Sequence, residues 1–285
     1  MDLRTRRLLK RTGMLVLLLI WTVFVIFPIY WVATTSLKTS GSVYQGPKWI
    51  PFVDYQPSLE TWQRFLGSEF WETLADPLLN SLVVSSVSTV FAVLFGTMAA
   101  YALTRYRFRV GFLQNRDILI FILSQRMMPP IVVGLAFYIM YRITGLLDTH
   151  LGLILVYIAF NLPLATWIMR NFLSQMPENV EEAAQIDGAT PWQVFRYVVI
   201  PMSLPSLAST FLICFVFAWN EFLFALILTF QKARTIPILI SAQHFQRGPQ
   251  WWAISVLVII AVVPAVIIAI SMQRYLIQGL VPGGK

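Results

Sequence analysis

The stretch MLVLLLIWTVFVIFPIYWVATTSL, residues 14–37, contains no charged side chain. A helix that crosses a bilayer needs about 20 mostly apolar residues. This run is also longer than the about 7–15 apolar residues of a signal peptide and lacks a clear small-residue cleavage site, so an uncleaved anchor is expected. Five similar runs follow, at residues 78–103, 117–141, 151–172, 204–230 and 252–275. The pattern predicts an all-α integral membrane protein with six transmembrane helices.

Composition separates this chain from soluble proteins. It is 58% hydrophobic and 12% charged, with a mean hydropathy of +0.70, whereas a soluble domain is about 25% charged. The net charge of +8 is typical of basic inner loops beside a lipid bilayer, so no nucleic acid is expected. The single cysteine, Cys214, excludes an intramolecular disulfide, and His150 and His244 are too far apart to predict a metal site.

Lysine and arginine in the loops predict the orientation. The N-terminus and the loop after the second run carry clusters of bases, among them Arg4, Arg7, Arg105 and Arg109. The segment 38–77 balances its few bases with acids. Because cytoplasmic loops carry an excess of Lys and Arg, both termini are predicted to be cytoplasmic.

The loop between the fourth and fifth runs, residues 177–201, is unusually acidic for a cytoplasmic loop. Pro177 and Glu178 suit the first turn of a helix, and Gly188 suits the left-handed residue that ends it. A second helix is then predicted, because a capping box with proline at its first position follows: Thr190, Pro191 and Gln193.

The first of these short helices has a surface of small side chains, Ala183 and Ala184. Such a surface would let a partner approach closely. An ordinary connecting hairpin is equally compatible with these local signals.

This loop resembles the Glu-Ala-Ala loop of the permeases of ATP-binding cassette (ABC) importers. Glu182-Ala183-Ala184 is followed by Gly188 and then by Val198-x-Ile200-Pro201, a conservative departure from the Ile-x-Leu-Pro of the family pattern. The string Asp187-Gly-Ala-Thr-Pro-Trp-Gln-Val-Phe is similar to the carbohydrate branch of the maltose and glycerol-phosphate type. Other similar strings span most of the chain: they begin at Ala99, Gly145, Ala218 and Gln273.

The resemblance implies a type I importer permease in the bacterial cytoplasmic (inner) membrane, importing a sugar, polyol or related solute by alternating access. Its partners would be a second homologous permease subunit, an ATPase dimer that binds ATP and Mg, and a periplasmic or surface solute-binding protein. The hairpin would transmit motion from the ATPase. The residues assigned to this coupling are Glu181, Glu182, Ala183, Ala184, Asp187, Gly188 and Pro201.

The resemblance also gives a domain plan. The permease domain would occupy residues 14–275, between a cytoplasmic N-terminus, 1–13, and a cytoplasmic tail, 276–285. Residues 38–77 and 231–251 would form periplasmic loops. The second of these would reach the binding protein through Gln243, His244, Phe245, Gln246, Arg247 and Gly248.

Polar groups at membrane depth mark a candidate translocation path. Arg126 and Glu221 both lie about 13–14 Å from the ends of their runs, close to the midplane of a hydrocarbon core of about 30 Å. Intramembrane charges are functional candidates, although simple mutual neutralisation of Arg126 and Glu221 is the competing interpretation. Side chains at similar depth complete the candidate path: Asn161, Asn220, Ser88 and Thr89.

Catalytic motifs are missing from the sequence. It contains no Gly-x4-Gly-Lys-Ser/Thr phosphate loop, no His-Glu-x2-His and no Gly-x-Ser-x-Gly. A transport subunit is therefore predicted rather than an enzyme, with no catalytic residues, no metal and no cofactor of its own. An ion-coupled secondary transporter is the alternative, but the Glu-Ala-Ala loop would have no purpose in it.

Overall fold

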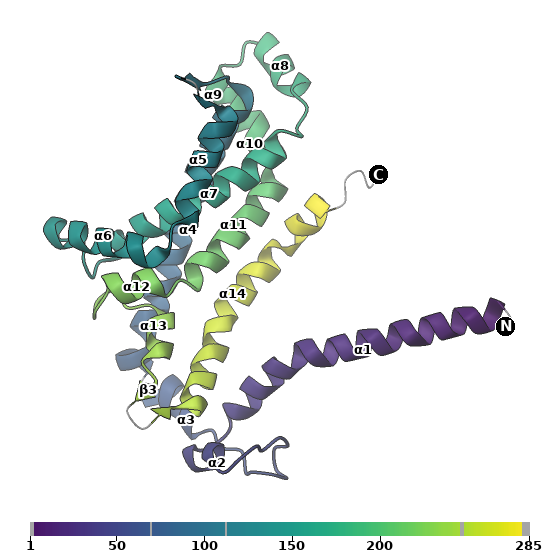
Figure 1. Ribbon diagram of the computed structural model, residues 1–285, viewed down its shortest axis with the longest axis vertical. Helices are drawn as coiled ribbons and strands as arrows, with labels where there is room; N and C mark the ends of the chain where they lie inside the picture. The colour runs from purple at the N-terminus through teal and green to yellow at the C-terminus, as the bar shows by residue number, and fades with distance from the viewer. Residues whose placement is uncertain (1–2, 69, 112, 246–247, 281–285) are drawn as a thin grey trace. The chain divides into compact units, whose positions relative to one another are not determined.

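A computed structural model describes residues 3–68, 70–111, 113–245 and 248–280 (Figure 1). The chain divides into two compact units. One comprises Met1–Leu74 and Ile240–Val262, and the other comprises Ala75–Leu239 and Val263–Lys285. Helices α13 (Ile236–Ser241) and α14 (Trp251–Leu280) each contribute residues to both units.

The first unit begins with the long helix α1 (Leu3–Thr35), whose large apolar side chains from Met14 to Ile29 are exposed. The segment after α1 is held by polar contacts, among them the Asp54 carboxylate, which accepts hydrogen bonds from the N–H groups of Trp49 and Ile50. The short elements of this unit are α2 (Ser40–Tyr44), α3 (Glu60–Gln63), the π-helical turns η1 (Arg64–Ser68) and η2 (Phe70–Leu74), and the strands β3 (His244–Phe245) and β4 (Gly248–Pro249).

The second unit is a helical bundle centred on two long helices, α4 (Ala75–Arg105) and α7 (His150–Leu173). A Cβ atom added at Gly96 would lie 2.7 Å from the Cβ of Ala165, so these helices approach more closely than any larger residue would allow. The small residue Gly96 therefore marks a point of close helix packing.

The remaining elements of this unit are short helices and one small hairpin. They are β1 (Arg109–Val110), β2 (Leu113–Gln114), α5 (Asn115–Met127), α6 (Pro130–Thr144), α8 (Asn179–Ile186), α9 (Pro191–Val194), the π-helical η3 (Phe195–Val199), α10 (Ile200–Met202), α11 (Leu204–Trp219) and α12 (Leu223–Leu228).

Four helices of the described chain are long and apolar enough to cross a membrane: Lys10–Thr35, Phe70–Arg105, His150–Leu173 and Trp251–Tyr275. Two bent helix pairs would bring the number to six. The prediction of a multi-span helical membrane protein is therefore confirmed in its coarser form of four to six spans.

Two of the predicted runs are broken rather than continuous. In the run 117–141, α5 and α6 meet at an angle of 86° because Pro129 and Pro130 cannot supply ladder N–H groups. In the run 204–230, α11 ends at Trp219. The side chains of Asn220 and Glu221 after it form hydrogen bonds with nearby backbone groups, which compete with a continued helix. Pro163, by contrast, lies inside a helix that continues to Leu173.

Candidate functional site

The predicted hairpin is present and is built by local capping. Its first helix, α8, begins at Asn179, two residues later than Pro177 suggested, with Glu178 at the N-cap. Gly188 has a φ of +87° and ends the helix. Its N–H bonds to the carbonyl of Gln185, and the N–H of Ala189 bonds to that of Ala184, the two bonds of a Schellman motif.

The second helix of the hairpin starts as predicted. The Thr190 N–H donates to Gln193 Oε1 over 2.7 Å, and the Gln193 N–H donates to Thr190 Oγ1 over 3.4 Å. Pro191 occupies the first turn. These reciprocal bonds fix the direction in which the chain leaves the turn at Gly188.

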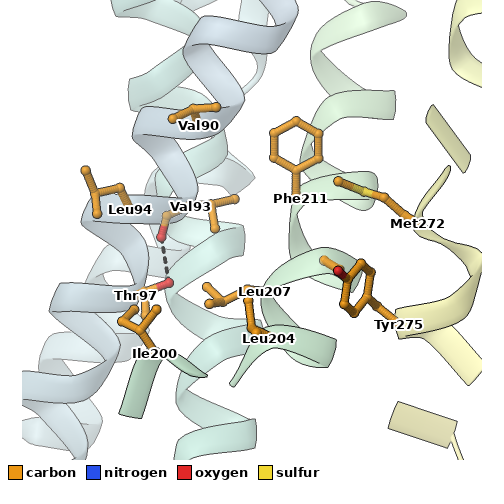
Figure 2. A pocket seen from close by; sticks show the side chains of 11 residues that line it. Val90, Val93, Leu94, Thr97, Ile200, Leu204, Leu207, Phe211, Met272 and Tyr275 are labelled. Atoms are coloured by element: carbon orange, nitrogen blue, oxygen red, sulfur yellow. Dashed lines mark hydrogen bonds between the residues drawn. The ribbon is translucent and has the colours of Figure 1, made fainter. Parts of the chain in front are cut away.

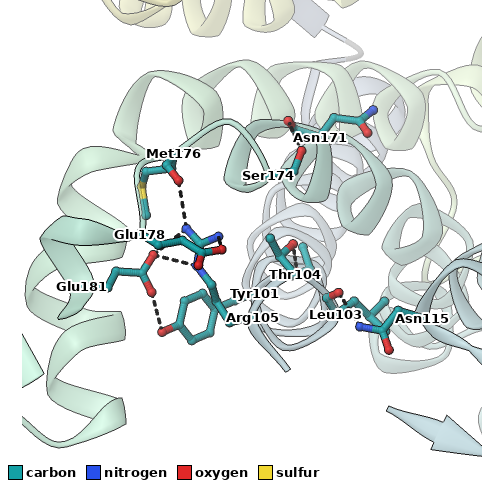
Figure 3. A network of polar contacts seen from close by, with 11 residues as sticks. Tyr101, Leu103, Thr104, Arg105, Asn115, Asn171, Ser174, Met176, Glu178 and Glu181 are labelled. Carbon is teal, nitrogen blue, oxygen red and sulfur yellow. Dashed lines mark hydrogen bonds and ion pairs between the residues drawn. The ribbon is translucent and has the colours of Figure 1, made fainter. Parts of the chain in front are cut away.

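An ion pair attaches α8 to the end of α4 (Figure 3). Arg105 Nη2 lies 2.7 Å from Glu181 Oε1, and the Tyr101 hydroxyl donates to Glu181 Oε2 over 3.0 Å. Arg105 also bonds to Glu178 and to the carbonyl of Met176. Glu181 is only 4% exposed, so its side chain faces the bundle and not a partner. No signal in the sequence indicated this inward orientation.

The opposite side of α8 is available to a partner. Glu182, Ala183, Asp187 and Gly188 are exposed, whereas Ala184 is half-buried. Ile186 is 86% exposed, although it is a large apolar residue on a polar hairpin. Ile186 is not among the coupling residues predicted from the sequence. The only signal for it there is that an apolar residue stands beside Asp187. Pro201 lies further along the chain, in α10.

Four of the predicted path residues line one cavity of about 330 Å³ in the second unit. The break between α11 and α12 supplies Asn220 and Glu221, while α5 supplies Arg126 and α7 supplies Asn161. Aromatic side chains complete the wall: Tyr157, Phe160, Phe217 and Phe222. Ser88 and Thr89 are fully buried in α4 and are not among the lining residues.

The groups that contact the Arg126 guanidinium in this cavity are neutral. Its Nη1 donates to the carbonyl of Phe160 over 2.8 Å and lies 3.4 Å from Asn161 Oδ1, and its guanidinium lies 4.5 Å from the centre of the Phe217 ring. Glu221 accepts from the N–H groups of Phe224 and Ala225 at the start of α12. Among the described residues, these two charges share the cavity but form no ion pair, so mutual neutralisation by direct contact does not describe this conformation.

A larger cavity of about 410 Å³ is unsuited to a polar solute (Figure 2). Its lining is almost entirely apolar, with Val90, Leu94, Leu207 and Phe211 among the side chains. The Thr97 hydroxyl in its wall is already bonded to the carbonyl of Val93. The smaller polar cavity is therefore the better candidate for a hydroxylated solute.

A carboxylate that the sequence did not single out fixes another loop. Asp148, with a φ of 55°, accepts hydrogen bonds from four consecutive N–H groups, those of residues 230–233. Burial raises the pKa of its carboxyl, but these N–H groups outweigh that effect and hold the pKa below its usual value. Nearby, Asn80 bonds to the carbonyls of Lys232 and Arg234.

The predicted contact loop forms a small hairpin of β3 and β4 in the first unit. His244 is exposed, Gln243 is 7% exposed, and Gly248 has a φ of +100°. Phe245 pairs with Gly248, whereas Gln246 and Arg247 lie outside the described residues. Residues 281–285 of the predicted tail lie outside them as well. Within the described part, no group of three His, Cys, Asp or Glu side chains is placed to hold a metal ion.

Apolar helices that could span a bilayer, broken around a polar cavity, define this chain as a membrane transport protein. The family described as "Binding-protein-dependent transport system inner membrane component" matches residues 92–281. The chain belongs to this family and is a permease subunit rather than an enzyme. Membership in this family gives no support to the alternative of an ion-coupled secondary transporter.

Named relatives are similar over nearly their whole length. The trehalose/maltose transport system permease protein MalG of Thermococcus litoralis is 33% identical, with 96% of each chain covered. The trehalose transport system permease protein SugB of Mycobacterium tuberculosis is 34% identical, with 91% of this chain and 92% of the relative covered. A bacterial ABC transporter chain involved in alginate import has the same fold, with a TM-score of 0.73, 24% identity and coverage of 97% of this chain and 99% of that chain.

Proposed function

We propose that this chain is one of two homologous permease subunits of an ATP-driven importer for a sugar, polyol or related hydroxylated solute in the bacterial cytoplasmic membrane. A separate ATPase dimer would bind ATP and Mg, and a solute-binding protein would deliver the solute. Six spans with both termini in the cytoplasm would place α8 and α9 on the side of the ATPase. The trehalose and maltose relatives support the solute class.

The observation that carries the proposal is the exposed face of α8. Arg105 and Tyr101 hold Glu181 and so attach the helix to α4. Glu182, Ala183 and the 86% exposed Ile186 then face away from this attachment. A movement of a docked ATPase would therefore be transmitted to α4 through a charged contact rather than absorbed by a loose loop.

The polar cavity is the proposed part of the translocation path in this subunit. Arg126, Asn161, Asn220 and Glu221 offer donors and acceptors that suit hydroxyl groups. The neighbouring rings of Phe160 and Phe217 suit the apolar faces of a sugar ring. Alternating access would open this cavity to each side in turn, and the hairpin of β3 and β4 would contact the binding protein.

The test uses the chain expressed with its partner subunits in membrane vesicles. Ile186→Asp changes a side chain that is 86% exposed, so it should leave insertion intact while releasing the ATPase and abolishing ATP-dependent uptake. Phe108→Asp is the matched control, because Phe108 is also an exposed apolar side chain, 41% exposed, in the neighbouring loop. Retention of the ATPase and of uptake by Ile186→Asp would refute the docking role.

A further inference from the structure

A cavity of about 500 Å³ in the first unit has no part in the proposed transport cycle. It lies where α1 ends and α14 begins, and the segment after α1 closes it. Both helices are candidate membrane spans, so their ends lie at a membrane boundary. Trp31 and Trp251 in the wall are typical of that boundary.

A buried cation lines this cavity. Lys38 is only 4% exposed, donates one hydrogen bond to the carbonyl of Lys48 over 2.8 Å, and lies 4.5 Å from the ring centre of Trp31. Among the described residues it forms no ion pair. The acid that influences it, Asp54, accepts hydrogen bonds from the N–H groups of Trp49 and Ile50. An ammonium has three donors, so Lys38 retains capacity for an oxygen-bearing ligand.

A second, independent group in the wall lacks a hydrogen bond. The Thr35 hydroxyl is buried, its residue is 5% exposed, and the oxygen has no hydrogen-bond partner in the part of the chain that the structure describes. An unsatisfied buried hydroxyl destabilises the folded state, so such groups are uncommon in native structures. A ligand oxygen in the cavity would satisfy it.

Apart from the hydroxyl of Ser255, the rest of the wall is mostly apolar. Val32, Ile254 and Val258 line it, on the two helices that are the candidate spans. A free oxyanion would leave this apolar surface unmatched, and a neutral sugar would leave the Lys38 charge unmatched. An amphiphile with an anionic head and a hydrocarbon tail matches both.

We propose that this cavity binds an anionic phospholipid, whose phosphate oxygens accept hydrogen bonds from the Lys38 ammonium and the Thr35 hydroxyl. One acyl chain lies along Val32, Ile254 and Val258. The lipid thereby joins the end of α1 to the start of α14. This site is separate from the polar cavity at Arg126 and does not depend on the proposed solute.

Native mass spectrometry of the chain, purified with its partner subunits and stripped of lipid, tests the site. The probes are phosphatidylglycerol, phosphatidylcholine and inorganic phosphate. We expect phosphatidylglycerol to be retained about tenfold more tightly than phosphatidylcholine. Lys38→Met should remove that preference, whereas Lys48→Met should keep it, because the Lys48 ammonium bonds to Gln45 outside the cavity.

Thr35→Val separates ligand binding from folding. It removes an unsatisfied hydroxyl without changing the shape of the side chain, so the lipid-free protein should be at least as stable as before, while phosphatidylglycerol binds less tightly. Equal retention of the two lipids, or full preference in Lys38→Met, would overturn the proposal. So would binding of inorganic phosphate with the same dependence on Lys38, because the site would then recognise a free oxyanion.

Discussion

Asp148→Ala is expected to release residues 230–233 from the bundle. The carboxylate makes five hydrogen bonds of 3.0–3.2 Å to four backbone N–H groups that lie more than 80 residues away in sequence. Each such bond contributes about 0.5–1.5 kcal/mol, and water would replace the bonds to the exposed N–H groups in the variant. Taking the lower value for each of the four groups gives about 2 kcal/mol, or roughly a 30-fold rise in the open population.

Limited proteolysis measures this opening directly, because the loop contains the trypsin sites Lys232 and Arg234. Cleavage follows the population of the open loop when opening is fast relative to cutting, so the rate should rise by a similar factor. Asp54→Ala is the control, since Asp54 also accepts two backbone N–H bonds but holds a different segment. Unchanged cleavage in Asp148→Ala, or an equal rise in Asp54→Ala, would refute the reasoning.

The depressed pKa of Asp148 gives the same loop a pH dependence of known sign. A carboxyl with a lowered folded-state pKa stabilises the folded loop fully above its unfolded pKa of about 4, and this contribution disappears as the pH falls through the folded value. Amide hydrogen exchange at residues 230–233, corrected for intrinsic rates, should therefore show weaker protection below about pH 4. In Asp148→Ala that change should be absent.

Two further predictions concern the contacts of α4. Arg105→Met leaves the Glu181 carboxylate, which is 4% exposed, without its cation, and should destabilise the protein by about 3 kcal/mol. Arg107→Met changes an exposed arginine and should have little effect. The double variant Arg105→Met/Glu181→Met should recover much of the lost stability, measured by thermal unfolding. Gly96→Ala places a Cβ 2.7 Å from that of Ala165 and should destabilise the protein by about 1–3 kcal/mol, whereas the new Cβ of Gly13→Ala has no described atom within 4 Å. Equal melting temperatures for the two glycine variants would contradict the close approach of α4 and α7.

Features that depend on local chemistry or on the bilayer could be predicted from the sequence. Long apolar runs identify α1, α4, α7 and α14, because lipid offers no partner to an unbonded backbone group. The turn at Gly188 and the capping box of Thr190 and Gln193 were predicted because the bonds that make them join residues close in sequence.

Which polar groups contact each other could not be predicted from the sequence, because it depends on how the helices pack. Depth in the membrane placed Arg126 and Glu221 at one level, but depth does not fix the direction of a side chain, and Glu221 bonds to the start of α12 instead of to Arg126. Glu181 and Glu182 are adjacent and chemically identical, yet Glu181 is buried in an ion pair with Arg105 whereas Glu182 is exposed. Asp148 bonds to residues 230–233 because helix packing brings these distant segments together, and the spacing of residues in the sequence does not predict this packing.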